Sequence, residues 1–372
     1  MIYILEDFSQ ISFGGGQRFT VAILIACSHI SKSICINHLG SSLKFKERLL
    51  DSLEIVDNIK FSKTSNSSNL ISRFIFLLSL ISCLTSNPGS IYLSCTKFCT
   101  VTLILSSSLF GAFSADKFIL FHHLHPPANL IISFIYSIAF NSSRFIHVYP
   151  SNYVLNQYHS KYRIPAIHYV SPTPCIRLPK AHSNGVPTPL FQAHASLESD
   201  IIFGYVGMIH PSKGLFQLIA LLSTFRSKHP TYRFTLKIYG TGPDAFLSKL
   251  FSIMQTSQYS IQFYGSIQTN QQVFSEMNCL FVPSWNLNET LCFTALEGIA
   301  YSGFVLLAPT AVLKEYGDNP NVSFINSNPI DFCETLDQLW LNISTCKYLL
   351  DSKVIVDDSG LFESFWSGLL SF

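Results

Sequence analysis

Short apolar runs alternate with apolar-periodic segments through the second half of the chain. Each run is typical of a buried parallel strand, and each following segment repeats its apolar residues at helical spacing. The expected strands cover residues 201–206, 233–239, 260–264, 279–282 and 305–308, and the expected helices cover residues 214–228, 243–254, 271–277 and 291–302. This alternation predicts a doubly wound α/β domain with a parallel sheet.

The first half of the chain repeats the pattern with weaker signals. An apolar run at residues 2–5 predicts a first strand, and the glycine turn at residues 14–16 leads into an expected helix at residues 19–27. The other expected elements are strands at residues 33–37, 90–95, 118–121 and 144–149 and a helix at residues 45–53. These signals are too sparse to give a topology by themselves.

A proline-rich passage separates the two halves. Residues 171–189 contain five prolines and no periodic pattern, which predicts a linker. A chain of 372 residues also exceeds the size of a comfortable single core. We therefore expect domains at residues 1–185 and 186–345, followed by a C-terminal segment at residues 346–372.

The C-terminal segment has a helical pattern of its own. Leu361, Phe362, Phe365 and Trp366 recur at helical spacing. A terminal helix often crosses back to the first domain in two-domain folds of this kind, and we expect that packing here. The alternative is a helix that caps the second domain.

Composition describes a chain that buries much of itself or lies against something apolar, since 48% of its residues are hydrophobic and only 12% are charged. No uninterrupted apolar run reaches the roughly 18 residues of a membrane span. The first residues, Met1 to Leu5, have neither a basic flank nor a cleavage site, so we expect no signal peptide. Ten cysteines without paired spacing indicate buried thiols in a reducing cytoplasm.

Charge differs between the two halves. Residues 1–185 carry 15 basic and 7 acidic side chains, and the remainder carries 9 and 15. A basic, apolar first half favours peripheral contact with an anionic membrane. Nucleic acid is disfavoured as a partner because arginine is sparse and no basic run occurs. An ordinary charge imbalance without a partner is the alternative.

Candidate chemistry gathers at the ends of the expected strands. Gly207 follows the strand at residues 201–206, and Lys213 stands at the next helix start, where a cation suits a diphosphate. The next two strands end at Gly240 and Gly265, which favours close approach of a flat or phosphorylated ligand. Tight turns without a ligand explain each glycine equally well.

The last of these loops holds two acids. Glu289 and Glu297 follow the strand at residues 279–282, the first at the mouth of a helix and the second inside it. One acid at each depth suits two parts of one polar ligand at the carboxyl edge of the sheet. Two solvated acids on a helix are the alternative.

Three histidines, His122, His123 and His125, follow the expected strand at residues 118–121. Side chains at a strand's carboxyl end face the ligand-binding crevice of such folds, so contact with a polar substrate is favoured over a purely structural role. A zinc site would need further ligands at defined spacing, which the sequence does not show.

This ordered set of loops resembles the retaining nucleotide-sugar glycosyltransferases of family 4. The resemblance is continuous from about Phe203 to Asn321 and weaker before that. Earlier segments that resemble the family's motifs are Gly14-Gly15-Gly16-Gln17-Arg18, His122-His123-Leu124-His125 and Tyr149-Pro150-Ser151-Asn152-Tyr153. The resemblance implies the GT-B fold, α/β with two facing Rossmann-like domains and a C-terminal helix that crosses back.

The resemblance also implies roles for residues of the second domain. Glu289 would contact hydroxyls of the donor sugar and Glu297 the ribose, and Lys213 would neutralise the diphosphate. The remaining donor-binding residues that it implies in this domain are Gly207, Gly240, Gly265 and Ile267 in the strand-end loops, with Gly265 and Ile267 near the base, and the backbone N–H groups of Leu291, Cys292 and Phe293.

Residues of the first domain receive roles in the same way. Gly15 and Gly16 would lie near the phosphate and the acceptor, and His125, with His123 as the alternative, would contact the donor sugar. Arg18 would face the same ligand. The implied catalytic residues are therefore Lys213, Glu289 and His125.

Two departures from the family pattern matter for activity. Met208 stands where the family usually has an arginine, which removes one cation from the diphosphate site. Arg18 could substitute, or the enzyme is slow, or the site has lost catalysis. Thr290 and Cys292 replace two glycines, which tightens the sugar pocket.

The resemblance implies a retaining hexosyltransferase that moves a sugar from a nucleotide diphosphate to a glycan or lipid-linked acceptor, in cell-surface polysaccharide or glycoconjugate biosynthesis. It implies no cofactor and no metal, since Lys213 and helix N-termini replace the cation. The expected location is cytoplasmic, with peripheral contact at the inner face of the membrane. The alternatives are a non-catalytic sugar-nucleotide-binding module and, less favoured, a GT-B epimerase.

Overall fold

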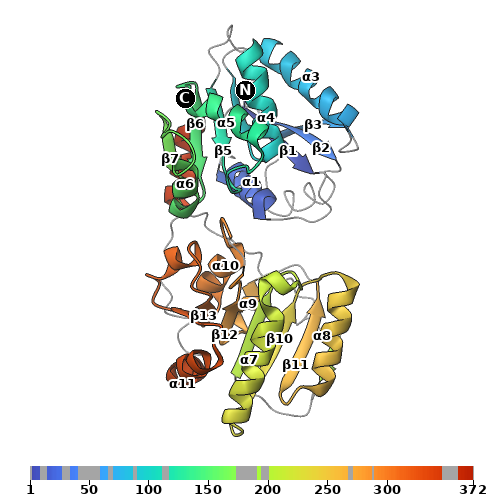
Figure 1. The fold of residues 1–372 in the computed structure, drawn as a ribbon, viewed down its shortest axis with the longest axis vertical. Helices are drawn as coiled ribbons and strands as arrows, with labels where there is room; N and C mark the ends of the chain where they lie inside the picture. The colour runs from blue at the N-terminus through green and yellow to red at the C-terminus, as the bar shows by residue number, and fades with distance from the viewer. Residues whose placement is uncertain are drawn as a thin grey trace. The chain divides into compact units, whose positions relative to one another are not determined.

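The chain folds into two compact units (Figure 1). Unit 1 comprises Met1–Cys175 and Asp357–Phe372, and unit 2 comprises Ile176–Val356. The expected boundary at residues 185 and 186 lies outside the described residues. The computed structural model describes residues 2–8, 15–26, 34–40, 59–65, 70–86, 90–110, 117–172, 191–193, 201–266, 271–286, 289–345 and 359–371.

Unit 1 is built on a seven-stranded sheet in which every pairing is parallel. The strand order is β3-β2-β1-β4-β5-β6-β7. The strands are β1 (Ile2–Phe8), β2 (Ile34–Gly40), β3 (Ile59–Ser65), β4 (Ile91–Ser94), β5 (Lys117–Phe121), β6 (Phe145–Tyr149) and β7 (His168–Val170). The order reverses between β1 and β4, as in doubly wound folds.

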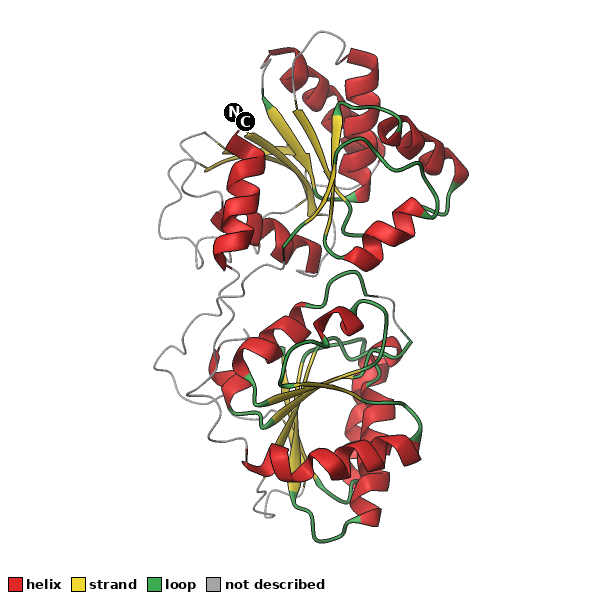
Figure 2. Cartoon of the chain, turned by 90° about the vertical axis from the view of Figure 1, so that its left-hand side faces the viewer, coloured by secondary structure: helices red, strands yellow, loops and turns green. Residues whose placement is uncertain are grey.

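Helices cover both faces of this sheet (Figure 2). One face packs against α3 (Leu70–Ser86), α4 (Lys97–Phe110), α5 (Leu130–Phe140) and α6 (Asn152–His159). The other face carries α1 (Gly15–Ala26) and α12 (Ser359–Ser371), which contact each other. Polar side chains start two of these helices: Asn129 accepts from the amides of Ile131 and Ile132, and Ser151 accepts from that of Val154.

The terminal helix α12 is part of unit 1. The Trp366 ring is fully buried and meets Phe19 and Phe121 edge-on at centroid distances of 6.2 and 6.0 Å. Its indole N–H donates to the Ser171 hydroxyl at 3.1 Å. Phe365 packs edge-on against Tyr169 at 5.9 Å. These contacts explain why unit 1 consists of two separate stretches of the chain.

Unit 2 contains the regular alternation that the sequence predicts. Its sheet has the order β14-β13-β12-β9-β10-β11-β8 and is parallel except at β8. The strands are β8 (Phe191–Ala193), β9 (Ile201–Val206), β10 (Phe234–Tyr239), β11 (Ser260–Gly265), β12 (Cys279–Val282), β13 (Phe304–Leu307) and β14 (Val322–Phe324). The order reverses between β9 and β12.

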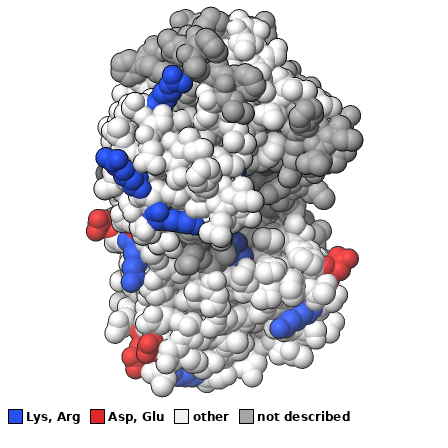
Figure 3. Space-filling view, turned by 45° about the horizontal axis from the view of Figure 1, so that its top comes forward, with Lys and Arg blue, Asp and Glu red and all other residues white. Residues whose placement is uncertain are grey.

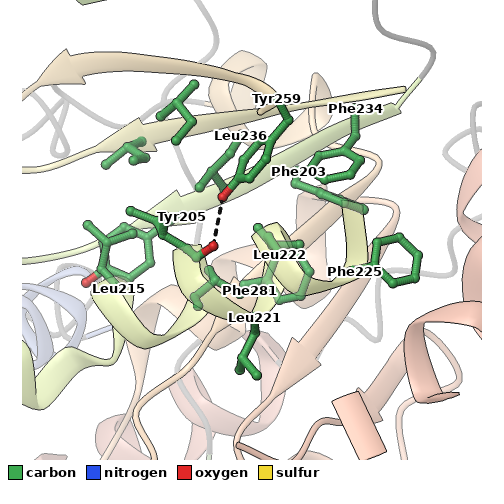
Figure 4. Close-up of a cluster of buried hydrophobic side chains, with 14 of the residues drawn as sticks. Phe203, Tyr205, Leu215, Leu221, Leu222, Phe225, Phe234, Leu236, Tyr259 and Phe281 are labelled. Atoms are coloured by element: carbon green, nitrogen blue, oxygen red, sulfur yellow. Dashed lines mark hydrogen bonds between the residues drawn. The ribbon is translucent and has the colours of Figure 1, made fainter. Parts of the chain in front are cut away.

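Two apolar cores stabilise unit 2, one on each face of the sheet. Helices α7 (Leu215–Lys228), α8 (Asp244–Thr256) and α11 (Pro329–Thr345) pack on one face. Figure 4 shows Leu222 and Phe225 of α7 against Phe203 of the sheet. Within that core the Tyr259 hydroxyl donates to the Ile219 carbonyl at 3.2 Å, so a buried polar group is satisfied. Helices α9 (Gln271–Ser275) and α10 (Phe293–Tyr301) pack on the other face.

Several expectations need correction. Helix α1 begins at Gly15, so Gly15, Gly16 and Arg18 lie in its first turn and not in a loop before residue 19. Helix α10 begins at Phe293 and not at Leu291. Helices α3, α4, α5 and α11 were not predicted, nor were strands β3, β7, β8 and β14. The expected helix at residues 45–53 lies outside the described residues.

Membrane-spanning helices are absent from the part of the chain that the structure describes, because no helix there has both the length and the hydropathy of a span.

A buried histidine pair lies in the core of unit 1. His122 Nε2 and His147 Nδ1 are 2.9 Å apart, and the two rings stack. Burial lowers the pKa of His147 to about 3 and holds the pKa of His122 well below its usual value. Both imidazoles are therefore neutral at pH 7. The expectation that His122 faces a ligand is wrong, because the ring is only 2% exposed among aromatic side chains.

Replacing Trp366 should destabilise unit 1. We expect Trp366→Ala to lower the free energy of unfolding by about 3–5 kcal/mol, because a fully buried ring leaves a cavity. Leu361→Ala on the same helix is the control, since Leu361 is 63% exposed and should change stability little. Urea unfolding curves measure both variants. Equal stability of the two variants would show that α12 does not complete the core.

Acid should also destabilise unit 1. The folded pKa values of His122 and His147 lie below the unfolded value of 6.5. Their contribution is therefore complete above that pH and is lost as pH falls toward the folded values. Each imidazole that stays neutral in the folded protein at pH 4.5 should lower the free energy of unfolding by about 2–3 kcal/mol relative to pH 7. Urea midpoints across this range measure the effect.

The matched variant replaces both histidines with phenylalanine, which preserves ring packing and removes the titrating groups. We expect its stability to depend less steeply on pH between 6.5 and 4.5. An unchanged slope would assign acid sensitivity to other groups.

Candidate functional site

The candidate site of unit 2 lies at the carboxyl ends of β9, β10, β11 and β12. Because β12 pairs directly with β9, the loops that follow these two strands are neighbours. Strand order reverses between them, and open parallel sheets bind their ligands at such a switch point. Lys213 follows β9 and Glu289 follows β12, so topology brings together two residues that are 76 positions apart.

Gly214 fixes the loop that carries Lys213. Its backbone has a φ of 76°, and a side chain at this position would put Cβ 1.8 Å from the carbonyl oxygen of Pro283. Only glycine allows this approach. The loop after β9 is therefore held against the end of β12, and Lys213, the last residue of a short 3-10 turn (Pro211–Lys213), is placed beside the β12 loop.

An ion pair joins the two loops. Lys213 Nζ lies 2.7 Å from Glu289 Oε1, and the Ser284 hydroxyl donates to the same oxygen at 3.0 Å. The side chains of Lys213 and Glu289 are 25% and 11% exposed. The pair is thus partly shielded from water but reachable from it, and its net charge is zero.

Three weak acids with raised pKa values surround Glu289. Burial, and then the Glu289 carboxylate, raises the pKa of the Cys292 thiol and of the Tyr205 hydroxyl. Burial, and then Cys292, raises the pKa of Tyr316. All three groups remain protonated at neutral pH. They line the pair with uncharged groups, which strengthens its electrostatic interaction.

Position 208 holds an uncharged methionine, so it does not supply a second cation to the site. Its side chain is 51% exposed, and its carbonyl oxygen accepts from the Tyr205 hydroxyl at 2.8 Å. The backbone is therefore held in place while the side chain extends toward solvent. An arginine fits at this position without displacing a buried group.

Two helices begin at the site without a side-chain cap. Gly214 precedes α7 and Cys292 precedes α10, and neither side chain makes a capping hydrogen bond. Helices α5 and α6 of unit 1 are capped by Asn129 and Ser151. A helix start with N–H groups and a positive dipole end favours an anion.

The residues predicted to bind the donor at α10 differ in how deeply they are buried. Leu291 is partly buried, and the Cys292 amide lies 3.5 Å from the Tyr316 hydroxyl, to which it donates weakly. Phe293 begins the helix. Glu297 is only 1% exposed, so its carboxylate is buried in unit 2, and its contact with a ribose stays a prediction.

The strand-end glycines have a structural explanation. A side chain at Gly240 would put Cβ 1.8 Å from the Gly207 carbonyl oxygen, and the Gly240 amide donates to the Gly265 carbonyl at 2.8 Å. The three loops thus contact one another through their backbones. The tight-turn alternative explains why Gly240 is a glycine, and donor binding by Gly207, Gly240 and Gly265 stays a prediction. Ile267 lies outside the described residues.

The predicted residues of unit 1 come from two segments of the chain, the start of α1 and the loop after β5. Gly15, Gly16 and Arg18 lie in the first turn of α1. His125 is partly buried and meets Tyr153 edge-on at 5.9 Å, near the start of α6. Burial, and then the charge of Lys97, lowers the pKa of His123 to about 4, so this ring is neutral at pH 7.

Across the described ranges, no three His, Cys, Asp or Glu side chains gather in a set that could hold a metal ion.

Sequence reasoning missed three contributors. Ser284 supports Glu289, and its place directly after a buried strand could have identified it. Tyr205 and Tyr316 are buried groups whose pKa values are raised first by burial and also by the Glu289 charge, but no local motif marks them. Tyr316 in particular lies in a short 3-10 helix (Leu313–Tyr316) that only the fold brings near Cys292.

Solved structures share the fold of the whole chain. HepE of Anabaena, in complex with UDP, matches with a TM-score of 0.71 and 12% identity, covering 100% of this chain and 98% of that one. The lipopolysaccharide outer core galactosyltransferase WaaB, in its apo form, matches at 0.64 and 14%, covering 100% and 99%. WaaG, a glycosyltransferase involved in lipopolysaccharide biosynthesis, matches at 0.64 and 12%, covering 99% and 100%.

Sequence comparison finds a family match within unit 2. No curated protein matches the chain. The family model described as glycosyl transferases group 1 matches residues 188–349, which include Lys213, Ser284 and Glu289. The two units of the chain have the GT-B fold, and residues 188–349 of unit 2 match the model of the glycosyl transferases group 1 family.

Proposed function

We propose that the protein is a retaining, metal-independent glycosyltransferase that transfers a hexose from a nucleotide diphosphate sugar. The observation that carries the proposal is the Lys213–Glu289 pair at the switch point of unit 2, with two uncapped helix starts beside it. A sugar diphosphate carries hydroxyls and anionic oxygens side by side. The pair offers one acceptor for hydroxyls and one cation for phosphate.

In this proposal Lys213 binds the diphosphate and Glu289 binds the sugar. The lysine ammonium has three N–H donors, and one is directed at Glu289. The other two remain for the diphosphate, where positive charge stabilises the departing nucleotide. Glu289, held by Ser284, accepts from the sugar hydroxyls and so positions the anomeric carbon.

The retaining outcome is proposed to follow from front-face substitution. The bond from the anomeric carbon to the diphosphate breaks, and the acceptor oxygen forms its bond on the same face. The departing diphosphate takes the proton of the acceptor hydroxyl. No side-chain nucleophile is required in this scheme.

The classes of donor and acceptor can also be proposed. HepE was solved with UDP and with UDP and glucose, which makes a UDP-hexose the first donor to test. We propose a glycan or lipid-linked acceptor bound by unit 1, with Gly15, Gly16, Arg18 and His125 nearest to the reacting groups, and a role in cell-surface polysaccharide or glycoconjugate biosynthesis.

A sugar-nucleotide-binding module without turnover is the second candidate. Met208 favours it, because the site then has one cation, and Glu289 already neutralises that cation. Such a site would bind a donor and release it unchanged. Turnover assays with UDP-, GDP- and ADP-sugars separate the two candidates.

Removing the charge of Lys213 should abolish most of the turnover. We expect Lys213→Met to reduce donor hydrolysis or transfer by about 10²–10³-fold, the effect of losing one preorganised electrostatic contact. Glu289→Gln should raise the KM for the donor and lower kcat, because a sugar contact is weakened. Nucleotide release measures both variants.

Lys237→Met is the matched control. Lys237 and Glu276 form a second 2.7 Å ion pair in unit 2, but Lys237 lies within β10 and not at a strand end. We expect its specific activity per folded molecule to stay unchanged. If Lys213→Met and Glu289→Gln both leave turnover unchanged, the Lys213–Glu289 pair is not part of the active site.

Restoring a cation at position 208 should raise the rate. Met208 is half exposed, so Met208→Arg adds charge near Lys213 without disturbing the core. We expect kcat to rise by about tenfold or more, since a second cation stabilises the diphosphate leaving group. Met208→Gln is the uncharged control. An unaltered kcat would mean that leaving-group departure does not limit the rate.

A further inference from the structure

Helix α5 of unit 1 presents an apolar face to solvent. Leu130, Ile131 and Phe134 in its first two turns are 85%, 72% and 68% exposed. The opposite face, with Tyr136 and Phe140, is buried against the sheet. Surface helices of globular domains normally carry polar residues on their outer face, so this helix departs from the usual pattern.

The loop after α6 extends this surface. The Tyr162 hydroxyl lies 2.9 Å from that of Ser133 on α5, and the Tyr162 ring stacks on Phe140 at 4.7 Å. These contacts hold the loop beside α5. Ile164, two residues after Tyr162, is 58% exposed. Exposed apolar side chains therefore come from two elements that are fixed to each other.

Basic side chains flank the surface, and the segment of the chain that forms it contains no acidic residue. The sequence contains no Asp or Glu between Lys117 and Pro172. Arg144 follows the C-terminal end of α5, and Arg163 and Lys161 stand near its start, where the Lys161 ammonium donates to the Pro127 carbonyl. All three basic side chains are exposed. Figure 3 shows one face of the molecule, on which most of the described surface is uncharged.

We propose that the face formed by Leu130, Ile131, Phe134 and Ile164 docks on an anionic lipid membrane. An apolar centre with basic residues around it matches the acyl boundary and the negative headgroups of such a membrane. With only 11 residues, α5 is about 16 Å long, so it lies in the interface and does not span it.

A second copy of this chain fits the surface less well. A symmetric dimer through this face would bring Arg144, Lys161 and Arg163 of both copies together around the apolar centre. No acidic residue of the same segment is available to pair with them. Like charges facing each other oppose association, whereas anionic headgroups neutralise them.

The docking face would bring a lipid-linked acceptor to the loop of His125. This inference rests on the proposed function. Helix α5 begins at Leu130, and His125 precedes it by a short loop that contains Pro126 and Pro127. A headgroup carried on a membrane lipid would therefore meet the loop of His125 next to the docking face. The acceptor class is then a lipid-linked one.

Vesicle binding tests the docking face without any turnover. The full-length protein is sedimented with vesicles of phosphatidylcholine alone or of phosphatidylcholine with phosphatidylglycerol, at low and high ionic strength. We expect at least about tenfold stronger binding to the anionic vesicles, reduced by salt. The variant Leu130→Ser/Ile131→Ser/Phe134→Ser should lose at least about tenfold in binding.

Two further variants complete the test. Ile330→Ser/Leu341→Ser is the matched control, because these residues of α11 in unit 2 are 68% and 70% exposed, and it should bind as the parent does. Arg144→Gln/Arg163→Gln should lose the preference for anionic vesicles. Circular dichroism confirms folding, which the serine variants should retain because the altered side chains are outside the core.

Three results would overturn the proposal. The first is an absence of binding to anionic vesicles at low ionic strength, and the second is equal binding by the triple serine variant and the parent. The third is a parent dimer that the triple variant converts to a monomer, which would assign the face to a second copy. Donor turnover with a water-soluble acceptor is measured separately, so failure of the docking face leaves the proposed activity intact.

Discussion

The contact of Gly214 with Pro283 is the constraint on which the candidate site depends. It holds the loop after β9 against the end of β12, so that Lys213 reaches Glu289 at 2.7 Å. The two strands are neighbours because the sheet order reverses there. Because Gly214 lies against the end of a buried strand, the sheet fixes the loop that carries Lys213. A site built in this way is organised before any donor binds, which is the condition for electrostatic stabilisation at low reorganisation cost.

The sequence predicted unit 2 far better than unit 1, and the reason is physical. In unit 2 each expected strand at residues 201–206, 260–264 and 279–282 has the bounds found in the structure within one residue. Its helices alternate apolar and polar residues because their outer faces meet water. In unit 1, α3 and α5 carry apolar residues on exposed positions, such as Ile75 and Phe134, and so lose the helical periodicity on which the prediction depends.

Prediction of the site divides along similar lines. Lys213 and Glu289 could be selected from their places after buried strands, and the structure brings them together. The residues around them could not be selected from the sequence, because Tyr316 comes from an element that is distant in the sequence. Glycine was ambiguous in the sequence, since ligand approach and backbone crowding both require it. At Gly240 the crowding is visible as a 1.8 Å approach to the Gly207 carbonyl, and a ligand is not needed to explain that residue.

The charge of the site sets the limit on what it can do. One lysine and one glutamate sum to zero, whereas a sugar diphosphate brings two negative charges. The starts of α7 and α10, each equivalent to roughly half a positive charge, supply part of the balance. The protonated Cys292, Tyr205 and Tyr316 add none. Helix dipoles attract the bound ground state and the departing nucleotide to similar degrees, so they favour binding more than rate. With methionine at position 208, specificity for the donor can therefore be retained while the chemical step is slow.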